Sequence, residues 1–146
     1  MNADRREEGV TETEGGETAE SETRQRLDGI TEKIIGCAYA VGNELGHGFA
    51  EKVHENSMLI EVRDAGLQAE QQHRIGVTYR GVPVGDYTAD LLVENAVLVE
   101  VKSARAFDDS HVAQCLNYLK GTGLSVRLLI NFGKSRVEVR RIVRDF

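Results

Sequence analysis

The strongest constraint on the fold of this 146-residue chain is the segment from Asp90 to Lys102, which reads Asp-Leu-Leu-Val-Glu-Asn-Ala-Val-Leu-Val-Glu-Val-Lys. Two apolar runs flank a short polar break, a pattern that predicts two buried strands joined by a tight connection. Asp90 stands beside the first run, and Glu100 and Lys102 end the second. Charged groups are expensive to place among core-forming strands. They are therefore expected where a metal ion or a reaction requires them.

The remaining apolar spacing predicts the other elements. Three- and four-residue spacing indicates helices, whereas short apolar runs between turn residues indicate strands. The helices are expected at Leu27–Leu45, Ala50–Ala65 and Ser110–Lys120. The strands are expected at Gln68–Tyr79, Val84–Val93, Val97–Ser103, Val126–Asn131 and Val137–Val143. This order predicts an α/β fold with helices flanking a mixed central sheet.

The first 26 residues form a separate, acidic segment. They hold eight acids and four arginines but almost no large apolar side chain. Such a segment cannot bury enough surface to offset its ordering entropy. We therefore expect a disordered tail at 1–26 and one domain at 27–146, with a solvated helical extension at the end of the tail as the alternative.

The composition of the chain indicates where in the cell the protein is expected and what it is expected to bind. No apolar stretch approaches the roughly 20 residues of a membrane span, and the acidic N-terminus is unlike a signal peptide. The two cysteines, Cys37 and Cys115, lie far apart, which favours reduced thiols in a cytoplasmic protein. The net charge is −6, yet the C-terminal part is basic. Its cations are Arg127, Lys134, Arg136, Arg140, Arg141 and Arg144. They are expected either to grip phosphates or to form a solubilising edge strand.

Strand geometry gives the charged segment its chemistry. Alternate side chains of a strand share a face, so Glu100 and Lys102 point the same way. A hairpin about residues 94–96 would bring Asp90 near Glu100. Adjacent carboxylates repel each other unless a cation lies between them, and hard oxygen ligands suit Mg²⁺ or Mn²⁺. The alternative is an ordinary surface acid and a Glu–Lys pair at strand ends.

These residues resemble the PD-(D/E)XK nuclease superfamily, in which Asp90 and Glu100-Val101-Lys102 match the signature acids and lysine. The resemblance narrows to the GxxExxY proteins, because Gly48-Phe49-Ala50-Glu51-Lys52-Val53-His54 is similar to the motif that names them. It covers about residues 28–143. Two positions depart from the pattern: His54 replaces the final tyrosine of the motif, and Ala89 stands where the superfamily name has proline.

The resemblance implies a restriction-endonuclease-like α-β-β-β-α-β core and a Mg²⁺- or Mn²⁺-dependent nuclease acting on nucleic acid, with DNA as the expected form. Metal binding is implied at Asp90, Glu100, Val101 and Glu51. Lys102 would assist the attacking water. Gln114 and Tyr118, four residues apart on one helical face, resemble the Gln-x-x-x-Tyr motif of RecB-type nucleases and would line the active site.

Several alternatives stay open at this stage. Glu51 is also explained as an acid favoured by the helix N-terminus, Tyr118 is also explained by packing, and His54 is expected either to contact phosphate or to be an ordinary histidine. A homodimer is left open, and no membrane partner is expected. The rival function is a non-catalytic nucleic-acid or protein-binding module on a nuclease-like fold, because a fold alone does not settle function.

Overall fold

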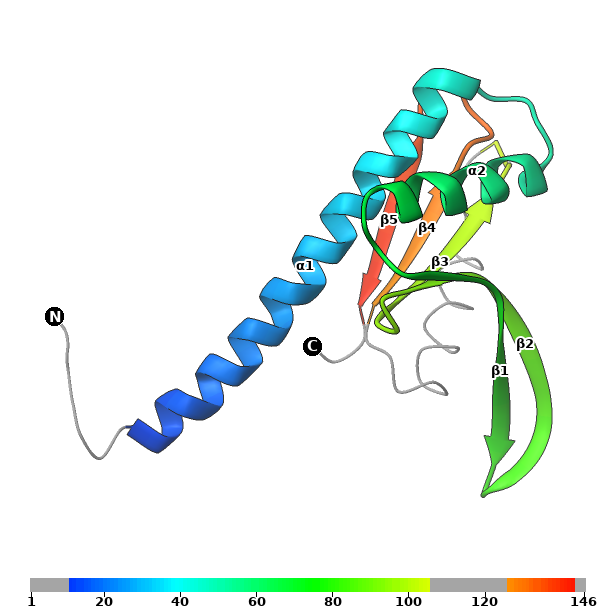
Figure 1. Ribbon diagram of the computed structural model, residues 1–146. Coiled ribbons are helices and arrows are strands. Elements are labelled where there is room, and N and C mark those ends of the chain that lie inside the picture. The colour runs from blue at the N-terminus through cyan, green and yellow to red at the C-terminus, as the bar shows by residue number, and fades with distance from the viewer. Residues whose placement is uncertain (1–10, 106–125, 144–146) are drawn as a thin grey trace, which may run out of the picture.

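The computed structural model describes residues 11–105 and 126–143, which form one mixed sheet and two helices (Figure 1). The helices are α1 (Thr11–Leu45) and α2 (Glu51–Asp64). The strands are β1 (Ala69–Tyr79), β2 (Val82–Val93), β3 (Val97–Lys102), β4 (Val126–Asn131) and β5 (Glu138–Val143). The five strands lie in the sheet in chain order.

One parallel pair makes the sheet mixed, as the sequence predicts. β3 and β4 run parallel, from Val97 beside Val126 to Lys102 beside Asn131. All other neighbouring strands are antiparallel. Parallel neighbours require a crossover connection between them. The expected helix Ser110–Lys120 falls in that connection and lies outside the described residues.

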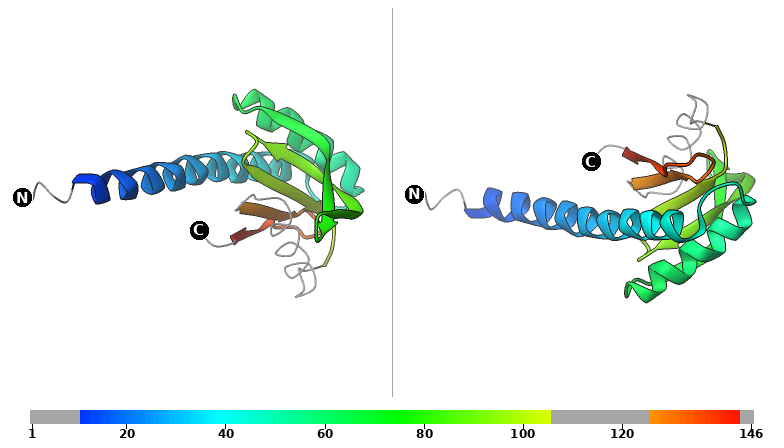
Figure 2. Two further views of the ribbon diagram at one scale, coloured as in Figure 1. Left: turned by 90° about the horizontal axis from the view of Figure 1, so that it is seen from below. Right: turned by 90° about the horizontal axis from the view of Figure 1, so that it is seen from above.

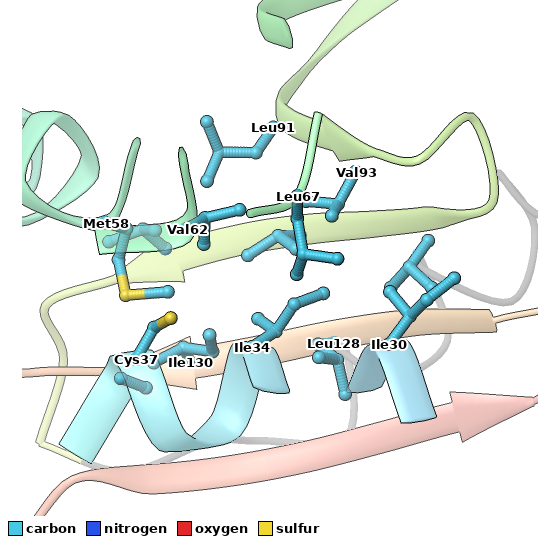
Figure 3. Packing of buried hydrophobic residues seen from close by; sticks show 14 of the residues in the cluster. Ile30, Ile34, Cys37, Met58, Val62, Leu67, Leu91, Val93, Leu128 and Ile130 are labelled. Atoms are coloured by element: carbon cyan, nitrogen blue, oxygen red, sulfur yellow. The ribbon is translucent and has the colours of Figure 1, made fainter. Parts of the chain in front are cut away.

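Both described helices cover the same face of the sheet and bury the main core (Figure 3). Ile34 of α1 and Met58 and Val62 of α2 are fully buried against Leu91 and the odd-numbered residues of β3. The opposite face carries a second cluster, consisting of Ile75, Ala89, Leu92, Leu98, Leu129 and Ile142. Since alternate residues share a face, Glu100 and Lys102 follow Leu98 onto this second face.

The turn between β1 and β2 is tighter than expected, whereas the connection between β2 and β3 has the expected length. β2 begins at Val82, so only Arg80 and Gly81 connect it to β1, both with positive φ (52° and 79°). Two successive positive φ values are typical of the hairpin turn that matches strand twist. Glu94 and Asn95 likewise have positive φ between β2 and β3. The predicted tight connection at 94–96 is confirmed.

Helix α1 begins well before the expected position at Leu27. It starts at Thr11, and residues 19–26 are exposed to solvent. The long helix projects away from the sheet (Figures 1 and 2). The half of α1 that packs on the sheet has already formed the helix. Extending it costs little free energy, because each added residue gains a hydrogen bond without a new nucleation step. Over residues 11–26 the structure has the helical extension that was the alternative to a disordered tail; residues 1–10 lie outside the described part.

Candidate active site

Asp90 lies at a fork, the point where strand β2 separates from its neighbour β3. The paired ladder runs from Val93–Val97 to Leu91–Val99 and ends there, although its register would set Asp90 opposite Glu100. The Asp90 Oδ2 instead accepts a hydrogen bond of 2.8 Å from the Val101 main-chain N–H. A carboxylate oxygen thus replaces a main-chain acceptor at the fork. This contact brings the Asp90 side chain to the Glu-x-Lys strand, as the hairpin geometry predicts.

Glu100 and Lys102 lie beside each other on the second face of the sheet. The Lys102 Nζ is 3.9 Å from the Glu100 Oε2, and the Lys102 and Glu100 side chains are 25% and 17% exposed. Both groups are therefore sheltered but reachable from solvent. This is the environment in which an ammonium group can act on a bound anion.

Arg127 of β4 is a buried partner of Glu100 that the sequence pattern does not predict. Its side chain is 1% exposed and forms an ion pair with the Glu100 Oε1. Its Nη1 also donates to the Tyr87 hydroxyl at 2.8 Å. The expectation that Arg127 belongs to a phosphate-gripping surface is wrong. The sequence does contain a feature that points to such a pair: Arg127 lies in an otherwise apolar strand. A buried charge there needs a partner of opposite charge, as Glu100 does.

Glu51 reaches the end of β3 from the first turn of α2. Its Oε2 accepts a hydrogen bond of 3.0 Å from the Ser103 N–H, immediately after Lys102. The Ser103 hydroxyl donates to the Phe49 carbonyl at 3.3 Å. The acid at this helix N-terminus is electrostatically favoured. Its position also joins α2 to the Glu-x-Lys strand.

Glu55, one turn beyond Glu51, is a second helix acid that the sequence pattern does not single out. It is 4% exposed. Its Oε2 accepts hydrogen bonds from the side-chain amides of Gln71 (2.6 Å) and Gln72 (2.8 Å) and from Lys52 (3.2 Å). Gln72 has φ of 56°, and the β1–β2 register passes over it. The register is the same on both sides of Gln72, so this is a local backbone irregularity without an inserted residue, and it lets two consecutive side chains reach one acceptor.

Burial is the main influence on the two core acids. It raises the pKa of Asp90, the Val101 hydrogen bond lowers it, and the charges of Glu55 and Glu51 raise it. Burial also raises the pKa of Glu100, against the lowering effect of Arg127, and the charge of Asp90 adds to the rise. Both carboxyls therefore hold protons more tightly than ordinary acids do. A divalent cation at the fork would relieve this repulsion.

The donor atoms at the fork suit a hard cation. Asp90 and Glu100 supply carboxylate oxygens, and Mg²⁺ commonly takes one or two carboxylates and keeps several waters. Among the described residues no three His, Cys, Asp or Glu side chains are grouped closely enough to hold a metal. The residues thus fit a site of two carboxylates completed by water rather than an all-protein cage. Gln114 and Tyr118 lie outside the described residues.

The mixed sheet, its helices and the forked acidic strand pair define a restriction-endonuclease-like α/β domain. Residues 28–142 match the sequence family described as the PD-(D/E)XK nuclease superfamily, and the chain belongs to this superfamily. Superfamily members act on nucleic acid and generally use divalent metals such as Mg²⁺. Membership of the GxxExxY proteins stays a prediction.

Among solved structures, the crystal structure of SSO0001 is similar in fold to this chain. The two are 17% identical in sequence, with a TM-score of 0.50. The match covers 85% of this chain and 62% of that chain, so this chain spans less than two thirds of its neighbour. No curated protein matches the sequence. Within the part of the chain that the structure describes, no helix is long and apolar enough to cross a membrane.

Proposed function

We propose that this protein is a divalent-metal-dependent nuclease that hydrolyses phosphodiester bonds in DNA. The observation that carries the proposal is the fork between β2 and β3. There, the Asp90 carboxylate accepts a hydrogen bond from Val101, between Glu100 and Lys102. Membership of the nuclease superfamily supports phosphodiester chemistry. The choice of DNA over RNA is part of the proposal.

Asp90 and Glu100 would hold Mg²⁺ or Mn²⁺, with the Val101 carbonyl and Glu51 as further candidate ligands. The bound ion supplies Lewis acidity towards a phosphoryl oxygen and lowers the pKa of water. The Val101 N–H orients the Asp90 carboxylate, and Arg127 orients that of Glu100. Preorganised ligands of this kind need no rearrangement when the substrate arrives.

Lys102 would act on the attacking water and on the charge that develops on the phosphate. Its Nζ lies 3.9 Å from a Glu100 oxygen, which keeps the ammonium beside the fork. Its side chain is one-quarter exposed and can therefore reach the phosphate backbone of a bound nucleic acid. Gln114 and Tyr118 are proposed to position the strand, a role that rests on the sequence resemblance alone.

The second candidate is a non-catalytic binding module on the same fold. The buried Arg127 already neutralises Glu100, and the described residues hold no group of three metal-binding side chains. A protein with this role would bind nucleic acid or protein without consuming it. Hydrolysis separates the two candidates.

The test is hydrolysis of linear, nicked, branched and single-stranded DNA by the purified full chain with Mg²⁺ or Mn²⁺. Lys102→Ala is the control variant, because removing Glu100 would also take away the carboxylate that pairs with the buried Arg127 and so could disturb the fold. We expect metal-dependent cleavage that falls at least about 100-fold in Lys102→Ala. The proposal fails if every substrate stays intact, or if cleavage persists at an equal rate in the variant.

A further inference from the structure

His54, which replaces the tyrosine of the resembled motif, is buried between two aromatic rings. It is 0% exposed. Its ring stacks on Phe132 with centroids 4.3 Å apart and planes 6° apart, and it meets the edge of Phe49 at 5.9 Å. The Nε2 lies 2.9 Å from the Gly46 carbonyl. This burial argues against the expectation that His54 contacts phosphate directly.

The Gly46 bond fixes the tautomer of the ring. A carbonyl oxygen can only accept, so the Nε2 of His54 carries the proton and donates. The Nδ1 is buried and finds no hydrogen-bond partner among the described residues. The Nε2 thus holds the turn before α2 through its hydrogen bond to Gly46, while the planar ring lies between Phe49 and Phe132.

Each of the two aromatic neighbours is tied to the end of β3. The Phe132 N–H donates to the Lys102 carbonyl at 2.9 Å. The Phe49 carbonyl accepts from the Ser103 hydroxyl at 3.3 Å. The Ser103 N–H in turn donates to Glu51. Two short chains of contacts, one through Phe132 and one through Phe49, therefore connect the His54 ring to the end of β3. This is the main chain that carries Lys102, the candidate catalytic lysine.

We propose that His54 is a positioning residue, whose planar ring sets the spacing between the start of α2 and the end of β3. It thereby holds Glu51 and Lys102 at a fixed separation. A tyrosine ring supplies the same planar faces, so the substitution relative to the motif keeps this role. The consequence for hydrolysis rests on the proposed function, whereas the effect on local structure does not.

The experiment measures amide hydrogen exchange in the full chain at Ser103, whose N–H donates to Glu51, and at Phe132, whose N–H donates to the Lys102 carbonyl. Leu128 in the core of β4 is the internal reference for global opening. His54→Leu and His54→Gln remove the ring, and His54→Phe keeps it. Met58→Ala is the matched control, because Met58 is equally buried in the same helix but packs in the main core. DNA cleavage is measured on the same four variants.

We expect exchange at Ser103 and Phe132 to rise about tenfold or more relative to Leu128 in His54→Leu and His54→Gln. His54→Phe should stay close to wild type, and Met58→Ala should change all three sites together. Cleavage should fall in the ringless variants and recover in His54→Phe. Unchanged relative exchange in the ringless variants, or equal loosening in His54→Phe, overturns the inference. Absence of cleavage in wild type contradicts the proposed function instead, while the exchange data still decide the role of His54.

Discussion

At the scale of single residues, Asp90 has two separate roles. Its carboxylate satisfies the Val101 N–H at the point where the strand ladder ends. It also carries a charge that is destabilised by burial and by the nearby Glu55 and Glu51. Accepting the Val101 N–H needs only an oxygen, whereas metal binding needs the negative charge. The amide side chain of Asp90→Asn keeps the oxygen but removes the charge, so this variant separates the two roles.

Asp90→Asn is therefore expected to keep the fold while changing its response to pH. Because the folded state raises the pKa of Asp90, this group stabilises the protein most fully below its unfolded pKa of about 4. That contribution is lost as the pH rises through the raised folded pKa. The unfolding free energy of wild type should thus fall relative to the variant across this window. The fall is about 1.4 kcal/mol for each pH unit that separates the folded pKa from the unfolded pKa.

Urea denaturation of both metal-free proteins from pH 4 to pH 8 measures this difference. Parallel stability profiles would mean that the Asp90 carboxyl titrates alike in the folded and unfolded states. A variant that is less stable at every pH would mean that its amide does not replace the acceptor for Val101.

The sequence predicts the acidic pair but not all of its surroundings. Asp90 and Glu100 stand out because both interrupt apolar strands and a short turn fixes their register. Glu55 does not, because its burial depends on an irregularity at Gln72 that has no signature in the local sequence. The Arg127–Glu100 pair joins strands that are adjacent only through the parallel β3–β4 contact. Local patterns do not encode such long-range pairs.

At the scale of elements, the end of β3 is fixed by a close main-chain approach from the turn after β4. The Asn131 side chain is fully buried and bonds both the N–H and the carbonyl of Ala104, each at 2.9 Å. A Cβ added at Gly133 would fall within 3.0 Å of three Ala104 main-chain atoms. Gly133 is therefore required for this approach.

Two glycine-to-alanine changes should have opposite effects. Gly133→Ala must displace the Ala104 main chain and is expected to destabilise the fold by about 1–3 kcal/mol. Gly36→Ala lies on an exposed position of α1 with no atom near the new Cβ. It should stabilise the helix by about 0.5–1 kcal/mol. Chemical denaturation compares them, and a Gly133→Ala protein as stable as wild type would refute the close approach.

Element boundaries follow the strength of the sequence pattern. β4 has the predicted bounds because its six residues are all buried and are bracketed by turn residues. β2 begins two residues before the predicted start, because the pattern places Pro83 in a turn whereas the structure places it in the strand. Proline is compatible with a strand where its missing N–H is not needed. The tight turn at Arg80 and Gly81 requires φ values that composition alone does not indicate.

At the scale of the whole molecule, the domain and its helical extension are distinct in packing. Leu27 and Ile30 begin the buried stripe of α1, whereas residues 19–26 are exposed. Arg26 contacts the domain through an exposed ion pair of 3.8 Å with Glu94. Surface pairs of this kind contribute little. The boundary between residues 26 and 27 remains a prediction that this contrast supports.

Deletion of residues 1–26 should therefore leave a folded domain. We expect an unfolding free energy within about 1 kcal/mol of the full chain, since no buried contact is lost from residues 19–26. Urea denaturation and DNA cleavage of the two proteins check this. A truncated chain that fails to fold would show that the extension belongs to the domain.

Asp90 and Glu100 are proposed to bind one catalytic divalent ion together. Titration of Mn²⁺ into the full chain, followed by electron paramagnetic resonance, tests this proposal without reference to any substrate. Asp90→Asn is the matched variant, because it retains the acceptor for Val101 while removing one ligand charge. We predict saturable Mn²⁺ binding to wild type, weakened at least about tenfold in Asp90→Asn. Equal Mn²⁺ binding by both proteins, or none by wild type, would contradict the account.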